Sequence, residues 1–340
     1  MFVSNKIMKY YIIAELREKY KNLLNTETIY NDYVSKKSMN DLVSACQQNG
    51  YDCEFLGGIN ELKEYSNSCE NINECIFINY NYGTPAKYKR GQCPIFLESI
   101  NAKYSGSDPL TSLIVNDKYF CKKILSDKIK VPKSFLLQSK NDINNEILNK
   151  LNYPVIVKPN SEGSSLGIDE SSYCTSYNLA INKAISLLDD FSPILVEEYV
   201  PGFEITVWII GNKNNYKLIQ PLLISSDNKF YYENKIFTMN DKANHNRKYY
   251  LPDIILPNKV IRNIIDFSKI IFEELGMRDY GRIDFRIYNN EIYFIEANAL
   301  PIFSKSSEIG EISKLCNESY ENICKKLIDT ITSRLMSETD

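Results

Sequence analysis

The sequence predicts a mixed α/β and α+β protein with more than one domain, and three observations indicate it. At 340 residues the chain is long enough to bury two or three cores. Its first part alternates short apolar strands with helices, as an open parallel sheet does. Its second half contains longer strands in which apolar and polar residues alternate, among them a hairpin over residues 281–298.

Composition excludes several function classes. The chain is 44% hydrophobic and 24% charged, as ordinary globular proteins are, and its net charge of -3 predicts no nucleic-acid partner. No apolar run approaches the ~20 residues of a membrane span, so no membrane partner is expected. Nine scattered cysteines without a Cys-x-x-Cys pair indicate reduced thiols in a cytoplasmic protein and argue against zinc. The single histidine, His245, lies in a polar run, which argues against Ser/His/Asp or Cys/His catalysis.

The first part of the chain predicts a parallel sheet with a ligand loop. Strands are expected at residues 8–14, 51–56 and 75–79, with a helix at 38–49. The polar loop 80–92 follows a strand, at the edge where such sheets usually place a ligand, and a helix is expected to start at Pro94. Turn residues at 104–109 indicate a domain boundary near Asp108.

The remaining elements follow in order. Helices are expected at residues 116–126, 143–151, 176–188, 257–275 and 311–335. Strands are expected at residues 133–138, 154–159, 193–202, 204–210 and 216–223. Residues 225–250 are polar and without a clear period, which predicts a long loop of the kind that serves as a lid.

The hairpin has a register that burial can predict. One apolar face must stay buried along both strands. This condition is met by a three-residue loop at 289–291 and the pairs Ile283 with Ala297, Phe285 with Ile295, and Ile287 with Tyr293. The opposite face then places Asp284 directly across from Glu296, and Phe294 across from Arg286.

The facing carboxylates predict a cation site. Like charges placed opposite each other across two strands are destabilising. Asp284, Glu296 and the nearby Asn298 all offer hard oxygen ligands, which suit Mg²⁺, and Mg²⁺ usually accompanies phosphates. The alternative is a solvated face on which Arg282 and Arg286 neutralise the acids.

A second signal lies upstream. The buried strand at 154–159 carries Lys158 near its end and runs into a Gly/Ser-rich loop, residues 160–167. Glycine lets backbone N–H groups approach a phosphate closely, and a lysine beside them supplies a point charge. The loop lacks the Gly-Lys-Ser/Thr ending of a Walker A motif. Taken alone, a Gly/Ser-rich loop after a strand is more often a simple turn. With the hairpin it predicts a nucleotide site.

These motifs, in their order and spacing, resemble the D-alanine–D-alanine ligase branch of the ATP-grasp enzymes. The resemblance covers roughly residues 91–307. It depends on five motifs: Tyr104-Ser-Gly-Ser-Asp-Pro, Asn116-Asp-Lys, Val155-Ile-Val-Lys-Pro with Glu162-Gly-Ser-Ser-Leu-Gly, Val196-Glu-Glu-Tyr with Gly202-Phe-Glu, and Arg282-Ile-Asp-Phe with Glu296-Ala-Asn.

The resemblance implies an ATP-grasp fold with a Rossmann-like N-terminal domain. We place the domains at residues 1–108, 109–192 and 193–340, with ATP held between the last two. It also implies ATP and Mg²⁺ (or Mn²⁺) as cofactors, a small-molecule carboxylate and an amine as substrates, and a homodimer, the common state in the family. The implied activity is ATP-dependent amide formation through an acyl phosphate.

The resemblance also implies roles for individual residues. It assigns Lys118 and Lys158 to the ATP phosphates, Ser164 to the phosphate-covering loop, Glu197, Glu198 and Val200 to adenine, Glu204 to ribose, Lys235 to the lid, Asp284, Glu296 and Asn298 to Mg²⁺, Arg282 to the reacting carboxyl group, and Ser306 or Ser307 to the second substrate's carboxylate. Our own register adds Phe294 as a floor for adenine.

Three departures from the family pattern all concern the amino-acid pocket. Residues 14–19 lack the glycines that normally accompany a glutamate after the first strand, Ile302 replaces a glycine, and Ile236 replaces the lid tyrosine. We therefore expect a specialised carboxylate–amine ligase whose substrates are not two D-alanines. The alternatives are D-alanine–D-alanine ligase itself and a non-catalytic nucleotide-binding relative.

Overall fold

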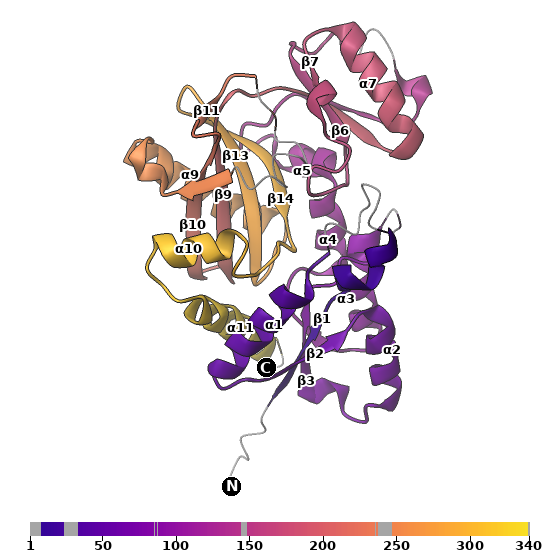
Figure 1. Cartoon of the computed structure of the whole chain (residues 1–340), viewed down its shortest axis with the longest axis vertical. Coiled ribbons are helices and arrows are strands. Elements are labelled where there is room, and N and C mark those ends of the chain that lie inside the picture. Colours follow the sequence, from indigo (N-terminus) through magenta and orange to yellow (C-terminus); the bar gives the residue numbers. More distant parts are fainter. Residues whose placement is uncertain are drawn as a thin grey trace.

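Three lobes, each built on its own sheet, make up the protein (Figure 1). The computed structural model describes residues 8–23, 33–84, 86, 88–143, 148–234, 236 and 247–338. None of the helices within these ranges is long and apolar enough to cross a bilayer. The mixture of parallel and antiparallel sheets confirms the predicted fold class.

The N-terminal lobe is a four-stranded sheet of order β2-β1-β3-β4. Its strands are parallel, as predicted, and its fourth strand, β4, was not expected from the sequence. Its elements are β1 (Lys9–Ile13), α1 (Lys36–Gln48), β2 (Asp52–Gly57), α2 (Ile59–Ser68), β3 (Cys75–Asn79), α3 (Lys89–Ser99) and β4 (Lys103–Tyr104), with 3₁₀ turns at Arg17–Leu23 and Ile72–Glu74. The expected helix start at Pro94 is wrong. A proline at that point of α3 removes only the hydrogen bond to the carbonyl of Arg90, so the preceding turn still forms.

The central lobe is an antiparallel sheet of order β5-β8-β6-β7 with one long helix against it. Its elements are β5 (Ser134–Leu137), β6 (Val155–Pro159), β7 (Tyr173–Cys174), α7 (Tyr177–Asp190) and β8 (Ile194–Glu198), with 3₁₀ turns at Lys140–Asp142 and Glu170–Ser172. Because β8 pairs with β5 and β6, a boundary at residue 193 would cut this sheet. The expected helix at 143–151 falls largely on residues 144–147, outside the described residues.

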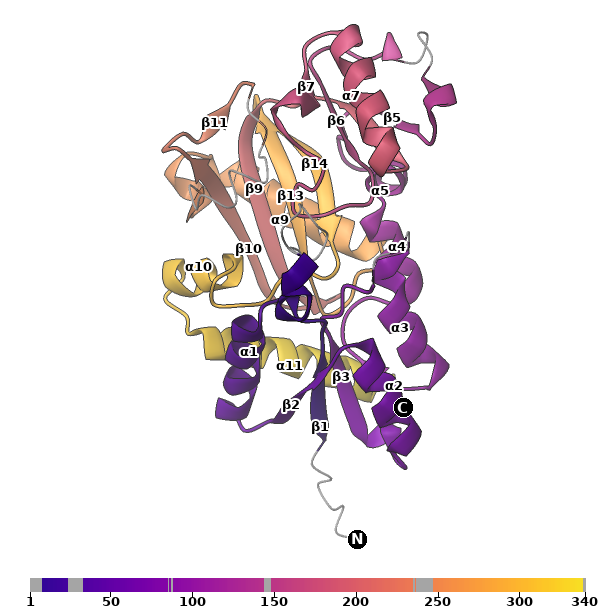
Figure 2. The same ribbon diagram turned by 45° about the vertical axis from the view of Figure 1, so that its right-hand side comes forward.

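The C-terminal lobe is a sheet of order β12-β10-β9-β13-β14, with β11 also paired to β9 (Figure 2). Its strands are β9 (Gly202–Asn212), β10 (Asn215–Ser226), β11 (Tyr231–Tyr232), β12 (Arg247–Tyr250), β13 (Tyr280–Tyr288) and β14 (Glu291–Asn298). Its helices are α9 (Asn258–Glu274), α10 (Glu308–Leu315) and α11 (Tyr320–Ser337), and a 3₁₀ turn lies at Pro252–Ile254. Two connecting helices, α4 (Pro109–Asn116) and α5 (Lys118–Leu125), follow the N-terminal lobe in the chain.

Two expectations for this lobe need correction. The segment 225–250 is not one loop, because β11 and β12 lie within it and extend the sheet. The single closing helix expected at 311–335 is two helices. Asn317 adopts φ 51°, which asparagine tolerates, and the Ser319 side chain accepts a hydrogen bond from the Asn322 N–H and so starts α11.

The hairpin register is half confirmed. Asp284 pairs with Glu296 as predicted, but a bulge at Ile295 then shifts the register, so that Phe285 pairs with Phe294. The loop has two residues, 289 and 290, with φ of 51° and 63°, which is typical of a type I′ turn. Phe294 therefore lies fully buried in the core, and its predicted role under adenine is wrong.

A buried ion pair joins the C-terminal helix α11 to the start of β13 and to the N-terminal lobe. Arg334 on α11 donates from Nε and Nη2 to the two carboxylate oxygens of Asp279, both at 2.7 Å, and also donates to the carbonyl of Tyr104 at 2.8 Å. Asp279 is fully buried and accepts the N–H of Gly106 at 2.8 Å. This cluster fixes the start of β13 against the N-terminal lobe.

Replacing Arg334 with methionine is expected to lower the free energy of unfolding by about 3–5 kcal/mol, because it leaves the Asp279 carboxylate buried without its cation. Urea denaturation measures this loss. The control is Arg262→Met on the exposed face of α9, which should change stability little. Equal stability of the two variants would show that the pair does not hold the lobes together.

Candidate active site

A cleft separates the central lobe from the C-terminal sheet, and we call it the interlobe cleft. Its walls come from β6, β8, β9, β13 and β14, and its empty volume is about 920 Å³, part of which is open to solvent. This size is typical of a site for a small organic ligand. Lys158, Glu197, Asp284 and Glu296 all line it, so the two signals predicted from sequence meet in one place.

Two facing carboxylates form one wall of the cleft. Asp284 on β13 and Glu296 on β14 are direct cross-strand partners, and Asn298 follows two residues further on the same strand. Burial raises the pKa of Asp284, and the negative charge of Glu296 adds to this, while Arg282 opposes it. The wall therefore concentrates negative charge where little water is available to stabilise it.

Neighbouring donors hold the Asp284 carboxylate. Arg282 donates to it from Nε at 3.1 Å and from Nη2 at 2.9 Å, and the Thr206 hydroxyl donates to it at 2.6 Å. Glu296 forms an ion pair with Lys118 at 3.5 Å. These contacts fix both carboxylates in orientation.

The donor set fits a hard divalent cation. Asp284, Glu296 and Asn298 provide oxygen ligands only, which are the ligands that Mg²⁺ prefers. Within the described ranges no group of three histidine, cysteine or acidic side chains is placed to hold a metal, so this set of two carboxylates and one amide is the candidate.

A buried cluster of three charges lies beside the carboxylate wall. Lys158 on β6 contacts Glu197 on β8 at 2.5 Å, and Lys122 on α5 contacts the other Glu197 oxygen at 3.2 Å. Burial raises the pKa of Glu197, but the two lysines outweigh it and hold the pKa below its ordinary value. Burial lowers the pKa of Lys122. The sequence analysis missed Lys122, although its spacing of four from Lys118 places both on one helix face.

The predicted adenine and ribose residues lie along the same cleft. Glu197, Glu198, Val200 and Glu204 all line it, and Glu204 accepts a hydrogen bond from Arg286 at 2.9 Å. Their roles remain predictions.

Three residues of this cleft were not identified from the sequence. Ile295, which the bulge turns toward the cleft, stands where Phe294 had been expected. Arg247 lies 3.6 Å from Glu204 and is the first residue of β12, within the long polar segment where no pattern indicated a site. Glu308 lies 3.5 Å from Arg282 at the start of α10, and nothing in its sequence context indicates a site.

The serines named by the resemblance have varied surroundings. Ser164 is exposed in the Gly/Ser-rich loop with φ 48°, and its neighbour Ser165 lines the cleft. Ser307 caps α10 by accepting a hydrogen bond from the N–H of Ile309, and Ser306 contacts Ser304 at 3.1 Å. Lys235, the predicted lid residue, lies outside the described residues.

Comparisons with known proteins identify the family. The family model described as D-ala D-ala ligase C-terminus matches residues 127–329. A D-alanine–D-alanine ligase of Carboxydothermus hydrogenoformans is 30% identical over 242 residues, which are 68% of this chain and 74% of that protein.

Solved structures share the whole fold. The D-alanine–D-alanine ligase of Bacillus anthracis complexed with ATP has a TM-score of 0.74 and 21% identity, covering 97% of this chain and 99% of that one. The VanG D-Ala:D-Ser ligase of Enterococcus faecalis has a TM-score of 0.72 and 20% identity, covering 95% and 99%. The chain therefore belongs to the D-alanine–D-alanine ligase family of ATP-grasp enzymes, and its activity falls in the class of ATP-dependent carboxylate–amine ligases.

Proposed function

We propose that the protein is an ATP- and Mg²⁺-dependent ligase that forms an amide bond between a carboxylate and an amine, and that its substrates are not two D-alanines. The observation that carries the metal-dependent part is the pairing of Asp284 with Glu296 in the cleft that also contains Lys158. A protein that only bound a nucleotide would have no need of two facing carboxylates that raise each other's cost of ionisation.

The reaction divides into two steps. An oxygen of the substrate carboxylate attacks the γ-phosphorus of ATP, the bond to ADP breaks, and an acyl phosphate forms. The amine then attacks the acyl carbon, phosphate leaves, and the amine loses a proton. Phosphoryl transfer depends mainly on positioning and charge neutralisation. We assign Lys158 and Lys118 to the phosphate oxygens, and Mg²⁺ held by Asp284, Glu296 and Asn298 would neutralise further charge.

Arg282 is suited to the second step. Its guanidinium is held by Asp284 on one side and by Glu308 at 3.5 Å on the other, so its position is fixed before substrate binds. The tetrahedral intermediate carries an oxyanion that needs a donor. We assign that donor to Arg282.

Replacing Arg282 with alanine is expected to slow amide formation by about 10²–10³-fold, the usual effect of losing one oxyanion donor. ATP affinity should change much less, because Lys158 and Lys118 remain. Steady-state rates and ATP binding by calorimetry measure the two effects separately. If the rate of amide formation and the ATP affinity fell equally, Arg282 would act in ATP binding and not at the reacting carbonyl.

Two bulky residues support a substrate other than D-alanine. Ile236 lines the interlobe cleft, and Ile302 packs against the hydrophobic core beside the end of β14. Both positions carry an isoleucine side chain in this chain, which changes the shape and polarity of the site that receives the amino acid.

The proposal is tested by measuring ADP release with ATP, Mg²⁺ and a panel of carboxylic acids, with hydroxylamine as a general amine that traps acyl phosphates as hydroxamates. Hydroxamate from acids other than D-alanine would support the proposal. Turnover with D-alanine alone would support the cell-wall ligase instead. No ADP release with any acid would support a nucleotide-binding protein without ligase activity.

A further inference from the structure

A buried lysine lies behind the wall of the interlobe cleft and takes no part in the reaction described above. Only 2% of the Lys122 side chain on α5 is exposed, and Lys122 is not among the described residues that line the cleft. Burying an ammonium group is costly unless an opposite charge compensates it. Any influence of Lys122 on a bound ligand must therefore pass through the residues that it contacts.

Three contacts fix the Lys122 ammonium group. It lies 3.2 Å from Oε2 of Glu197 on β8, and it donates to the backbone carbonyl of Ile295 on β14. Ile295 is the bulged residue, and a bulged residue is left unpaired in its ladder, so a donor from outside the sheet can reach it. The ring centre of Phe294 lies 5.5 Å from the same ammonium group. Lys122 is thus held from two strands and cannot follow a ligand into the cleft.

Glu197 is shared between two lysines, one on each carboxylate oxygen. Lys158 lies 2.5 Å from Oε1, while Lys122 approaches Oε2. Of these three residues, Lys158 and Glu197 line the cleft and Lys122 lies behind them. Their charges sum to +1. With Glu197 compensated from behind, the excess positive charge is available at the cleft on Lys158.

This arrangement solves a difficulty for a lysine that binds phosphate. The Lys158 ammonium group is paired with Glu197, whereas we assign it to a phosphate of ATP. If Lys158 were the sole counter-ion of Glu197, turning to a phosphate would leave a buried carboxylate without compensation, which is costly. Lys122 keeps that carboxylate compensated while Lys158 turns.

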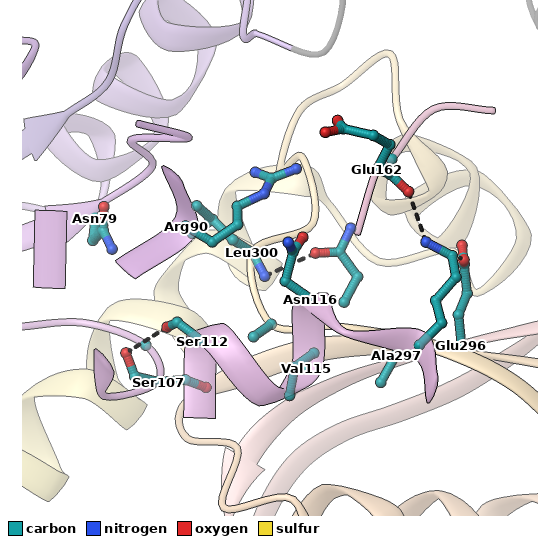
Figure 3. A pocket seen from close by; sticks show the side chains of 15 residues that line it. Asn79, Arg90, Ser107, Ser112, Val115, Asn116, Glu162, Glu296, Ala297 and Leu300 are labelled. Carbon is teal, nitrogen blue, oxygen red and sulfur yellow. Dashed lines mark hydrogen bonds and ion pairs between the residues drawn. The ribbon is translucent and has the colours of Figure 1, made fainter. Parts of the chain in front are cut away.

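The other lysine on this face of α5 is already engaged elsewhere. Lys118, one turn before Lys122, donates to the carbonyl of Glu162 at 2.6 Å, the contact drawn as a dashed line beside Glu162 in Figure 3. It also pairs with Glu296 at 3.5 Å. These three residues line a second cavity, of about 640 Å³ empty volume, which shares Glu296 with the interlobe cleft. Compensation of Glu197 therefore falls to Lys122.

We propose that Lys122 is a positioning residue for the ATP phosphates: it serves as the permanent counter-ion of Glu197 and so releases Lys158 to bind a phosphate oxygen. Lys122 does not touch ATP itself. The inference rests on the proposed ATP-dependent ligase function and adds to it a residue that sets how strongly the phosphates are bound.

The test compares ATP, in the presence of Mg²⁺, with adenosine, which has no phosphate. Calorimetry gives both dissociation constants, and the ratio of the adenosine constant to the ATP constant measures what the phosphates contribute. The variants are Lys122→Met, Glu197→Gln and the double variant that combines them. Lys123→Met, at the exposed next residue of α5, is the matched control, and urea denaturation verifies that each variant is folded.

Lys122→Met should raise the dissociation constant of ATP by about 10–100-fold, the effect of losing a hydrogen bond between charged groups, because Lys158 then stays with Glu197. The dissociation constant of adenosine should change by less than about threefold. Lys123→Met should leave both constants unchanged. An unchanged ATP constant, or an equal rise in both constants, would overturn the inference.

The double variant provides a second test that does not depend on the stability of Lys122→Met. Without the Glu197 carboxylate, Lys122 has nothing to compensate. The ratio of the two dissociation constants should therefore agree within about threefold between Glu197→Gln and the double variant. A clearly lower ratio in the double variant would show that Lys122 supports phosphate binding by another route and would contradict the inference.

Binding and turnover separate this inference from the proposed function. Ratios that change as expected, in a protein that forms no hydroxamate, would keep the role of Lys122 and contradict the ligase. Hydroxamate formation, in a protein whose Lys122→Met variant loses adenosine and ATP affinity equally, would keep the ligase and contradict the role of Lys122.

Discussion

Replacing Glu296 with glutamine is expected to reduce ADP formation by about 10²–10⁴-fold, because a metal ion that stabilises phosphoryl transfer typically contributes several kcal/mol. Excess Mg²⁺ should recover little of the rate, since a neutral amide replaces one of two anionic ligands. The measurement is the initial rate of ADP release as Mg²⁺ is titrated, with chelation of Mg²⁺ from the wild type as the parallel experiment.

The same substitution should leave the metal-free fold intact. It removes the repulsion between Glu296 and Asp284, which stabilises the fold, and it removes the ion pair with Lys118 at 3.5 Å, which destabilises it. The free energy of unfolding should therefore change by no more than about 1 kcal/mol. The control on the same strand is Glu291→Gln, at an exposed residue paired with Lys130, which should leave activity unchanged. Full activity in the Glu296 variant would remove the carboxylate pair from the metal site.

Replacing Glu197 with glutamine is expected to lower the free energy of unfolding by about 3–5 kcal/mol. The carboxylate is buried between Lys158 and Lys122, and its loss leaves two buried ammonium groups with one neutral acceptor. Urea denaturation measures the change. The neighbouring Glu198→Gln is the control. Among the described residues Glu198 accepts hydrogen bonds only from Asn152, and its side chain is partly exposed. This control substitution should therefore lower the free energy of unfolding by only about 1 kcal/mol.

The pH dependence of this difference has a definite sign. The folded protein holds the pKa of Glu197 below its ordinary value, so the folded state favours the ionised form. The stability that this provides is present at neutral pH and is lost as pH falls through the lowered pKa. The stability difference between wild type and the Glu197 variant should therefore shrink in acid. A difference that stayed constant from neutral to acidic pH would mean that Glu197 is not held by the two lysines.

Much of this architecture could be predicted because it depends on local patterns. The strands β1, β3 and β6 are short apolar runs between turn residues, and their ends were predicted to within two residues. The pairing of Asp284 with Glu296 also followed from alternation alone, because a strand can bury only one face.

The features that were missed depend on choices that alternation does not determine. A bulge at Ile295 preserves an apolar core just as a regular strand would, and it exchanged Phe294 for Ile295 in the cleft. The assignment of β8 to the central sheet depends on pairing with β6, which lies far from it along the chain. Lys122, Arg247 and Glu308 acquire their surroundings only in the folded state, so their residue type alone could not indicate a site.

One feature of the cores has a mechanical consequence. Residues of the N-terminal sheet, the C-terminal sheet and α11 share a single hydrophobic core, whereas the central lobe closes its own core with residues between Leu137 and Val196. We therefore expect two bodies: a larger base that carries the two carboxylates, and a smaller central lobe that carries Lys158 and the Gly/Ser-rich loop. Because Ser165 of that loop lines the interlobe cleft opposite Asp284 and Glu296, rotation of the central lobe would narrow the cleft around a bound nucleotide.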